Sequence, residues 1–221
     1  MSRITIIGGH GKVALHLARD LTANGHQVTS LFRNPQHTAD VEATGATAVV
    51  ADVENLSTEE IAQKLEGADA VVWSAGAGGG APERTYAVDR DAAIRSIDAA
   101  VAAGARRYVM VSYFGAGPEH GVPEDNGFYA YAEAKAAADE YLRHSGLDWT
   151  ILGPSALTMD PGTGKIEIGS GIEGTQVSRE DVALVAAAVL ERPGTIGQTI
   201  QFNNGSVAID TALDSFKEQN A

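Results

Sequence analysis

The 221-residue chain contains no cysteine. This absence excludes a disulfide framework and any cysteine-based metal or redox site. A chain of this length buries roughly two-thirds of the surface of its unfolded form, so it needs no cross-links to fold. A chain without cysteine also suits a reducing compartment, and we expect a cytoplasmic protein.

Basic residues are scarce as well. Sixteen lysines and arginines stand against 29 aspartates and glutamates, which gives a formal net charge of −13. A nucleic-acid or anionic-membrane binder needs a clustered basic face, so we expect neither partner, although a pocket for one small anion is compatible with this composition. The sequence also has no apolar run near the roughly 20 residues that span a bilayer, and no signal-peptide pattern follows Met1.

Metal-binding and hydrolase motifs are missing too. The histidines are scattered, no H-E-x-x-H motif occurs, and we therefore expect no metal site. No G-x-S-x-G elbow occurs either, which argues against a hydrolase.

What the chain does contain is an alternation of short β-branched runs with longer helical patterns. Strands are expected at residues 3–7, 27–32, 46–51, 70–74, 107–112 and 149–152, and helices at 13–22, 57–65, 86–103 and 128–144. This order predicts an α/β protein with a Rossmann-type, doubly wound parallel sheet. The pattern weakens after Pro154, where short strands are expected at 165–168 and 199–202 and a helix at 178–190. We expect a dinucleotide-binding core, residues 1–154, and a small C-terminal lobe, residues 155–221, packed on it within one structural domain.

Gly8, Gly11 and Ala14 form a G-x-x-G-x-x-A spacing between the first strand and the first helix. Such a turn lets a pyrophosphate approach bare backbone, and the helix N-terminus offers N–H groups and partial positive charge. A Walker loop is excluded because a valine stands where Ser or Thr should hold magnesium. A glycine turn without a ligand is the alternative. The cofactor contacts expected here are Gly8, His10, Gly11, Lys12 and Val13.

The second strand ends at Arg33, with no acid where an NAD-selective site places one for the adenosine ribose. A guanidinium makes charge-assisted contacts with a 2′-phosphate, so the sequence predicts that NADP(H) is preferred over NAD(H). An ordinary surface arginine is the alternative. Further cofactor contacts are expected from residues that follow the third and fourth strands: Asp52, Val53, Ser74, Ala75 and Gly76. For the aspartate, a simple turn role is the alternative.

Tyr131 and Lys135 are four residues apart on one predicted helix, so both can face the same cleft. A nearby ammonium favours the phenolate form of a tyrosine, whose ordinary pKa is about 10, and brings it toward use as a general acid or base. Lys135 can also hold the nicotinamide ribose. Ser112 ends the fifth strand and can hydrogen-bond a substrate carbonyl oxygen. We therefore expect Ser112, Tyr131 and Lys135 to be catalytic; a core-edge tyrosine beside a solvated lysine is the alternative.

Together these motifs resemble an atypical, extended-like short-chain dehydrogenase/reductase, of the group that includes NmrA-like and biliverdin-reductase-B-like proteins. The resemblance covers nearly the whole chain and rests also on residues 152–158 and 178–183. In that family the segment after the sixth strand contacts the nicotinamide end, which implies cofactor contacts from Pro154 and Ser155. One departure is Gly153, since relatives often carry an arginine before the proline.

The residues and the resemblance predict an NADP(H)-dependent oxidoreductase that transfers hydride to a small carbonyl, quinone or flavin-like acceptor. Two alternatives stay open. One is a non-catalytic NADP(H)-sensing regulator, because some relatives bind the cofactor without robust turnover. The other, ranked lower, is a nucleotide-sugar epimerase or dehydratase, for which the C-terminal lobe is small. The expected partner is a small-molecule substrate, and the expected assembly is a monomer or a homodimer.

Overall fold

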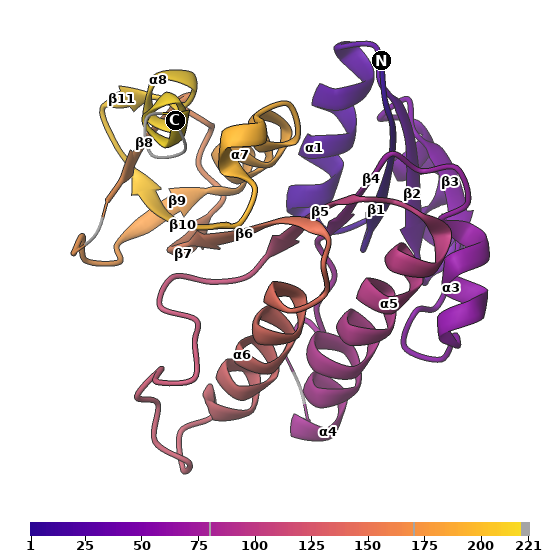
Figure 1. The fold of residues 1–221 in the computed structure, drawn as a ribbon, viewed down its shortest axis with the longest axis horizontal. Helices are drawn as coiled ribbons and strands as arrows, with labels where there is room; N and C mark the ends of the chain where they lie inside the picture. The colour runs from indigo at the N-terminus through magenta and orange to yellow at the C-terminus, as the bar shows by residue number, and fades with distance from the viewer. Residues whose placement is uncertain (80, 170, 218–221) are drawn as a thin grey trace.

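The computed structural model describes residues 1–79, 81–169 and 171–217. Its centre is a nine-stranded sheet in the order β11-β8-β10-β6-β5-β4-β1-β2-β3 (Figure 1). The strands that pair in parallel are β1 (Arg3–Ile7), β2 (Gln27–Phe32), β3 (Thr47–Val50), β4 (Ala70–Trp73), β5 (Arg107–Val111), β6 (Asp148–Pro154) and β10 (Gln198–Asn204). The predicted Rossmann-type sheet is confirmed. The strand order reverses between β1 and β4, which is where such sheets bind dinucleotides.

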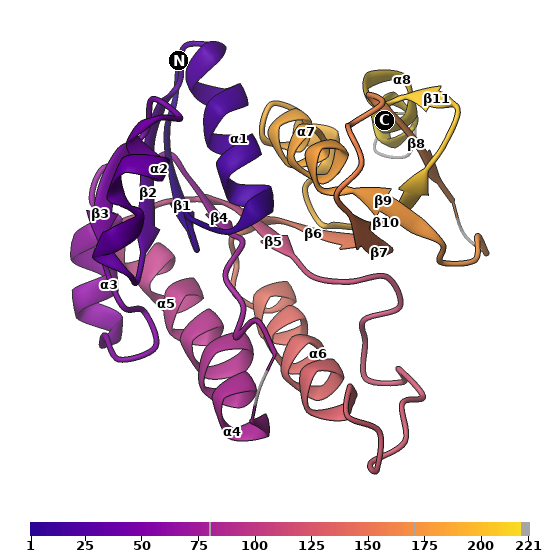
Figure 2. The ribbon, with the colours of Figure 1, turned by 180° about the vertical axis from the view of Figure 1, so that it is seen from behind.

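Helices cover both faces of the sheet (Figures 1 and 2). On one face lie α1 (Lys12–Ala23) and α7 (Arg179–Leu190), whose buried Leu17 and Val185 share one hydrophobic core. On the other face lie α3 (Thr58–Lys64), α4 (Pro82–Thr85), the π-helical η2 (Tyr86–Ala92), α5 (Ala93–Ala103) and α6 (Tyr129–Arg143). Ile97 and Leu142 belong to the second core on that face. No helix in the described part of the chain is long and apolar enough to cross a membrane.

Several predicted boundaries are confirmed by local interactions. Ser57 caps α3 through a capping box with Glu60, as its sequence order requires. Gly104 ends α5 with φ +74°, a left-handed conformation that favours glycine. The expected break of the sixth strand at Gly153 and Pro154 is wrong. β6 continues through both residues, because β10 pairs with residues 150–154 of β6 and the Pro154 carbonyl accepts the N–H of Phe114 at 2.9 Å.

The segment after Pro154 joins the same sheet. β8 (Lys165–Ile168) and β11 (Val207–Ala208) extend it in antiparallel fashion, while β7 (Ala156–Thr158) and β9 (Gln176–Ser178) form a separate parallel pair. The sequence did not predict β7, β9, β11, α8 (Ile209–Asp214), or η1 (Pro35–His37) and α2 (Thr38–Glu42), which follow β2. The division between residues 154 and 155 stays a prediction, and residues 218–221 of the expected lobe lie outside the described residues.

Candidate active site

The turn after β1 presses its backbone against the end of β4. Gly8 has φ +87°, and a Cβ there would lie 2.5 Å from the backbone of Ala75. The N–H groups of Gly8 and Gly9 both donate to the carbonyl of Leu31, at 3.0 and 2.8 Å. A Cβ at Gly11 would lie 3.1 Å from the carbonyl oxygen of Gly8. A side chain fits poorly at either position, so the glycines leave a bare backbone cradle at the edge of the sheet.

The N-terminus of α1 opens onto this cradle. No side chain caps the helix, and its first turn holds no acidic residue, so its partial positive charge is unopposed there. Ala14 is fully buried, which lets the helix pack closely on the strand. A glycine cradle followed by an uncapped helix N-terminus fits the pyrophosphate of a dinucleotide.

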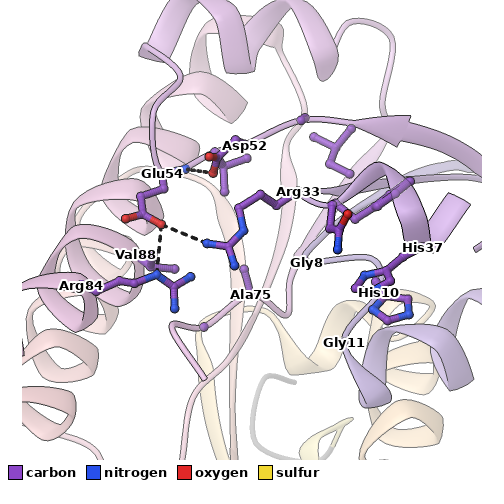
Figure 3. Close-up of a pocket in the computed structure, with 16 residues that line it drawn as sticks. Gly8, His10, Gly11, Arg33, His37, Asp52, Glu54, Ala75, Arg84 and Val88 are labelled. Atoms are coloured by element: carbon purple, nitrogen blue, oxygen red, sulfur yellow. Dashed lines mark hydrogen bonds and ion pairs between the residues drawn. The ribbon is translucent and has the colours of Figure 1, made fainter. Parts of the chain in front are cut away.

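A cavity of about 280 Å³ lies beside the cradle (Figure 3), and we call it the arginine cavity after Arg33 and Arg84 in its lining. Its floor follows the ends of β2 and β3. It brings together eight of the expected cofactor residues: Gly8, His10, Gly11, Arg33, Asp52, Val53, Ala75 and Gly76.

Two guanidinium groups in the arginine cavity share one carboxylate oxygen. Oε2 of Glu54 lies 3.5 Å from Nη1 of Arg33 and 3.3 Å from Nε of Arg84, and both arginines point toward it in Figure 3. The Arg33, Arg84 and Glu54 side chains are 56%, 34% and 24% exposed. Arg84 also donates to the carbonyl of Ala77. Sequence reasoning missed Glu54 and Arg84, because nothing local signals that α4 meets the turn after β3.

His10 and Asp52 line the arginine cavity but also have partners of their own. The ring of His10 stacks on that of His37, with 3.6 Å between centroids, and its Nε2 lies 3.1 Å from a carboxylate oxygen of Asp40. The Asp52 carboxylate accepts the N–H of Glu54 at 3.3 Å and also a side-chain N–H of the next residue, Asn55, at 2.9 Å. Asp52 therefore builds the turn after β3, which is the alternative that the sequence left open.

A second cavity, of about 460 Å³, adjoins the first, and Ala75 and Gly76 line both. We call it the tyrosine cavity, because Tyr131 of α6 lines it. Besides Ala75 and Gly76, four further expected site residues meet there: Val13, Ser74, Ser112 and Tyr131. The ring of Tyr131 lies 5.1 Å from that of Phe128, which also lines the cavity. The two cavities together form a cleft along the carboxyl edge of the sheet.

The charged groups that affect the Tyr131 phenol are carboxylates, not the Lys135 ammonium. Burial raises the pKa of its phenol, and the carboxylates of Asp89 and Asp139 and the phenol of Tyr113 raise it further. The sequence predicted that Lys135 would favour the phenolate; the pKa moves in the opposite direction, because burial and, after it, the carboxylates of Asp89 and Asp139 disfavour a negative charge on the phenol. The phenol is therefore protonated at neutral pH.

Ser112 meets an aspartate that sequence reasoning missed. Its hydroxyl donates to Oδ2 of Asp139 at 2.5 Å. Asp139 is 0% exposed, and its Oδ1 has no hydrogen-bond partner among the described residues. Burial raises the pKa of this carboxyl, against the opposing effects of Lys135, the Ser112 hydroxyl and Arg143. While Asp139 is ionised, the Ser112 hydroxyl donates its hydrogen bond to the carboxylate and presents lone pairs, not the predicted donor, to the tyrosine cavity.

Lys135 lies in the interior and lines neither cavity. Its side chain is among the largest fully buried ones, and Nζ donates to the carbonyl of Val111 at 2.9 Å and lies 3.3 Å from Sδ of Met110. Burial lowers its pKa, while Asp139 and Asp89 raise it. The sequence placed this ammonium beside the cofactor ribose. The structure places it behind the cavity wall, because Lys135 donates a hydrogen bond to the Val111 carbonyl at the end of β5, and the buried carboxylates of Asp139 and Asp89 favour its charge there.

Asp89 supports the glycine-rich loop after β4. It lies in η2, is 1% exposed, and accepts the N–H of Ala77 at 2.9 Å. A Cβ at Gly76 would lie 3.0 Å from its Oδ1, so a larger residue there would press on this carboxylate. Burial raises the pKa of this carboxyl, opposed by the bond from Ala77. π-Helical turns often mark functional sites, and this one aims a carboxylate into the tyrosine cavity.

Three further expected cofactor residues line neither cavity. Lys12 is exposed at the start of α1. Pro154 pairs with Phe202 inside the sheet, and Ser155 is 6% exposed, with a hydroxyl that no described residue hydrogen-bonds. Their assignment, like that of Lys135, rests on the sequence and the resemblance.

The chain belongs to a family described as NAD(P)H-binding, whose model matches residues 8–193. This match confirms the resemblance to an NAD(P)-binding family.

Several relatives match over nearly their whole length. A Bacillus subtilis protein, described as the uncharacterized sugar epimerase YhfK, is 35% identical over 96% of this chain and 98% of its own. The structure of a Bacillus halodurans protein, described as an NAD-dependent epimerase/dehydratase, is 31% identical, with a TM-score of 0.89 over 97% and 100% of the two chains. The oxidoreductase YlbE of Lactococcus lactis is 29% identical, with a TM-score of 0.85 over 98% and 97%.

A more distant structure shares the fold alone. The anaerobillin reductase ChuY of Escherichia coli O157:H7 is 22% identical, with a TM-score of 0.77 over 93% of this chain and 98% of that chain.

Proposed function

We propose that this protein is an NADP(H)-dependent oxidoreductase that transfers hydride to a small, uncharged carbonyl, quinone or flavin-like acceptor. The observation that carries the proposal is the continuous cleft. A glycine cradle and an arginine cavity lie at one end, and a protonated tyrosine lies at the other. The nucleotide half fits the first cavity and the cradle, and the reacting half fits the second.

The cofactor supplies the hydride, and the chain supplies the proton. Hydride reaches the carbonyl carbon of the acceptor while the phenol of Tyr131 gives its proton to the carbonyl oxygen, which leaves an alcohol. The raised pKa of the phenol keeps it protonated at neutral pH, so the proton is in place before the transfer. Solvent then returns a proton to the phenolate, whose charge Asp89 and Asp139 disfavour.

The acceptor is proposed to be uncharged because of what surrounds it. Among the described residues that line the tyrosine cavity there is no lysine, arginine or histidine, and Asp89 adds a carboxylate. Val13, Phe128 and Leu157 give the cavity an apolar wall. An anionic substrate would find no cation there and would meet a buried acid.

Arg33 supports the choice of NADP(H). It lines the arginine cavity at the end of β2, where Rossmann sheets bind the adenosine ribose, and its side chain is 56% exposed. A 2′-phosphate matches a guanidinium fork better than a ribose hydroxyl does.

A nucleotide-sugar epimerase is the second candidate, favoured by the descriptions of the Bacillus subtilis and Bacillus halodurans proteins. Such a substrate carries a diphosphate, which needs cationic or N–H donors on the substrate side. The cation-free lining of the tyrosine cavity supports the reductase over this candidate.

The test is turnover by the purified protein. NADPH and NADH are each offered with a panel of aldehydes, ketones, quinones and flavins, and oxidation is followed at the nicotinamide absorbance band. UDP- and dTDP-sugars are incubated in parallel and analysed by mass spectrometry and NMR. We expect oxidation of NADPH by one acceptor class. Epimerised sugar nucleotides would replace this proposal with the second candidate, and tight NADPH binding without turnover would favour a sensor.

A further inference from the structure

Glu54 stands where a phosphate-binding site has no evident use for a carboxylate. It lines the arginine cavity, its side chain is 24% exposed, and a single oxygen of it serves both Arg33 and Arg84 (Figure 3). An anion at this point repels an incoming phosphate, yet it satisfies the two cations that a phosphate would use.

The two arginines differ in how firmly they are held. Arg84 is tied from a second side, because it also donates to the carbonyl of Ala77. Ala77 is in turn fixed by Asp89, which accepts its N–H. In the described part of the chain Arg33 has no ion pair or hydrogen bond other than that with Glu54, and its side chain is 56% exposed. Arg33 is therefore the arm that can turn toward a ligand, and Arg84 is the fixed partner.

A phosphate monoester fits the place that Glu54 now fills. It carries close to two negative charges near neutral pH and three acceptor oxygens, enough to serve two guanidinium groups at once. Glu54 offers them one shared oxygen and a single charge, at 3.3 and 3.5 Å. The exchange of this carboxylate for a phosphate improves both the charge balance and the number of hydrogen bonds.

We propose that Glu54 is a built-in counter-ion that holds Arg33 and Arg84 in the free protein and yields them to the 2′-phosphate of NADP(H). Arg84 is then a second phosphate-binding residue, and Glu54 sets how strongly the phosphorylated cofactor is preferred. The inference rests on the NADP(H) site proposed above and adds these two residues to it.

The test isolates the 2′-phosphate from the rest of the cofactor. Binding of 2′,5′-ADP, which carries it, and of 5′-ADP, which lacks it, is measured by isothermal titration calorimetry at fixed ionic strength. The proteins are the wild type, Glu54→Gln, Arg84→Gln and Arg33→Ala. The matched control is Glu83→Gln, which removes the same charge from the exposed residue beside Arg84.

We expect Glu54→Gln to bind 2′,5′-ADP about threefold to tenfold more tightly than the wild type, since two partly exposed ion pairs no longer compete. Its affinity for 5′-ADP changes less than about twofold. Arg84→Gln binds 2′,5′-ADP roughly tenfold more weakly, with a much smaller change for 5′-ADP. Glu83→Gln changes neither affinity by more than about twofold.

Different failures have different meanings. If Glu54→Gln weakens 2′,5′-ADP binding, or if Glu83→Gln tightens it as much as Glu54→Gln does, the counter-ion role is wrong. Suppose that the counter-ion role fails in this way, but the wild type still prefers 2′,5′-ADP and Arg33→Ala removes that preference. The proposed choice of NADP(H) then stands, and only the inference about Glu54 fails. A wild type that binds both ligands equally overturns the two together.

Discussion

The two cavities of the cleft hold their charges in different surroundings. In the arginine cavity, Arg33, Glu54 and Arg84 are between 24% and 56% exposed. Around the tyrosine cavity, Asp89 and Asp139 are at most 1% exposed. Water screens the first set, so its pairs are weak and exchangeable. The second set lies in low dielectric, where burial shifts protonation states.

This difference assigns separate tasks to the two ends. Exchangeable surface charges suit the selection of a phosphorylated ligand, which replaces one set of ion pairs with another. Buried groups suit proton transfer, because their protonation is fixed before the substrate arrives. A change in the arginine cavity should therefore alter cofactor binding without altering the chemical step. A change in the tyrosine cavity should alter the chemical step without altering cofactor binding.

The largest effect is expected from Tyr131→Phe. Loss of the proton donor lowers kcat by about 10²- to 10⁴-fold, while the Kd for NADPH stays within about twofold. The measurement is steady-state turnover with the acceptor found in the panel, together with NADPH fluorescence titration. Tyr129→Phe, two residues earlier and lining neither cavity, is the control. A variant that keeps full turnover moves the proton source away from Tyr131, as in direct reduction of a flavin.

Arg33→Ala is expected to give the opposite pattern. Removal of the movable guanidinium raises the Kd for NADPH by roughly 10- to 100-fold and that for NADH by less than about twofold, with kcat at saturating NADPH little changed. Arg106→Ala, a change at an arginine whose side chain is 78% exposed and lines neither cavity, controls for net charge. Equal losses for the two cofactors would contradict the assignment of Arg33 to the 2′-phosphate.

A third prediction concerns pH and the buried carboxyl of Asp139. Its pKa in the folded chain is raised above the ordinary value of about 3.9, so between the two pKa values the folded state binds more protons than the unfolded state. The free energy of unfolding therefore falls as pH rises through that window, by about 1.4 kcal/mol for each pH unit that separates the folded and unfolded pKa values. The asparagine of Asp139→Asn does not titrate, and its side-chain oxygen can still accept the hydrogen bond from the Ser112 hydroxyl.

Urea denaturation of the wild type and Asp139→Asn from pH 4 to pH 8 measures this effect. We expect the stability of the variant relative to the wild type to increase with pH across the window. Ser112→Ala, which removes the hydrogen bond that favours the carboxylate, should enlarge the loss in the wild-type background. Parallel pH profiles for Asp139→Asn and the wild type would show that the carboxyl titrates normally.

The fold was predictable because its signals are local. The β-branched runs at residues 3–7 and 27–32 became β1 and β2 with the expected bounds, and the capping order at Ser57 became a capping box. The glycine cradle was equally predictable, since a strand, two glycines and a helix start follow one another along the chain. Each of these features is decided by residues within a few positions of one another.

The chemistry of the site was less predictable because distant residues decide it. The Tyr131 pKa depends on Asp89, which comes from another helix, and the pairing of Glu54 with Arg84 joins segments that share no motif. Asp139 could have been predicted from the sequence, because it continues the Tyr131 face of α6, four residues beyond Lys135. The buried position of Lys135 could not have been predicted, because it depends on which backbone carbonyl lies at the end of β5.

The smallest expected effect is a salt dependence confined to one cavity. An increase in NaCl from about 0.05 to about 0.5 M shortens the Debye length from roughly 14 to roughly 4 Å, which weakens contacts of exposed charges. The Kd for NADPH should rise about threefold to tenfold and that for NADH about twofold, because the proposed site holds the 2′-phosphate, which NADH lacks, among partly exposed arginines. The kcat at saturating NADPH should stay nearly constant, since the carboxylates near Tyr131 are out of contact with the salt. If the Kd values of the two cofactors depended equally on salt, the arginine cavity would not select between them. A kcat that changes with salt would show that the tyrosine cavity is not shielded from water.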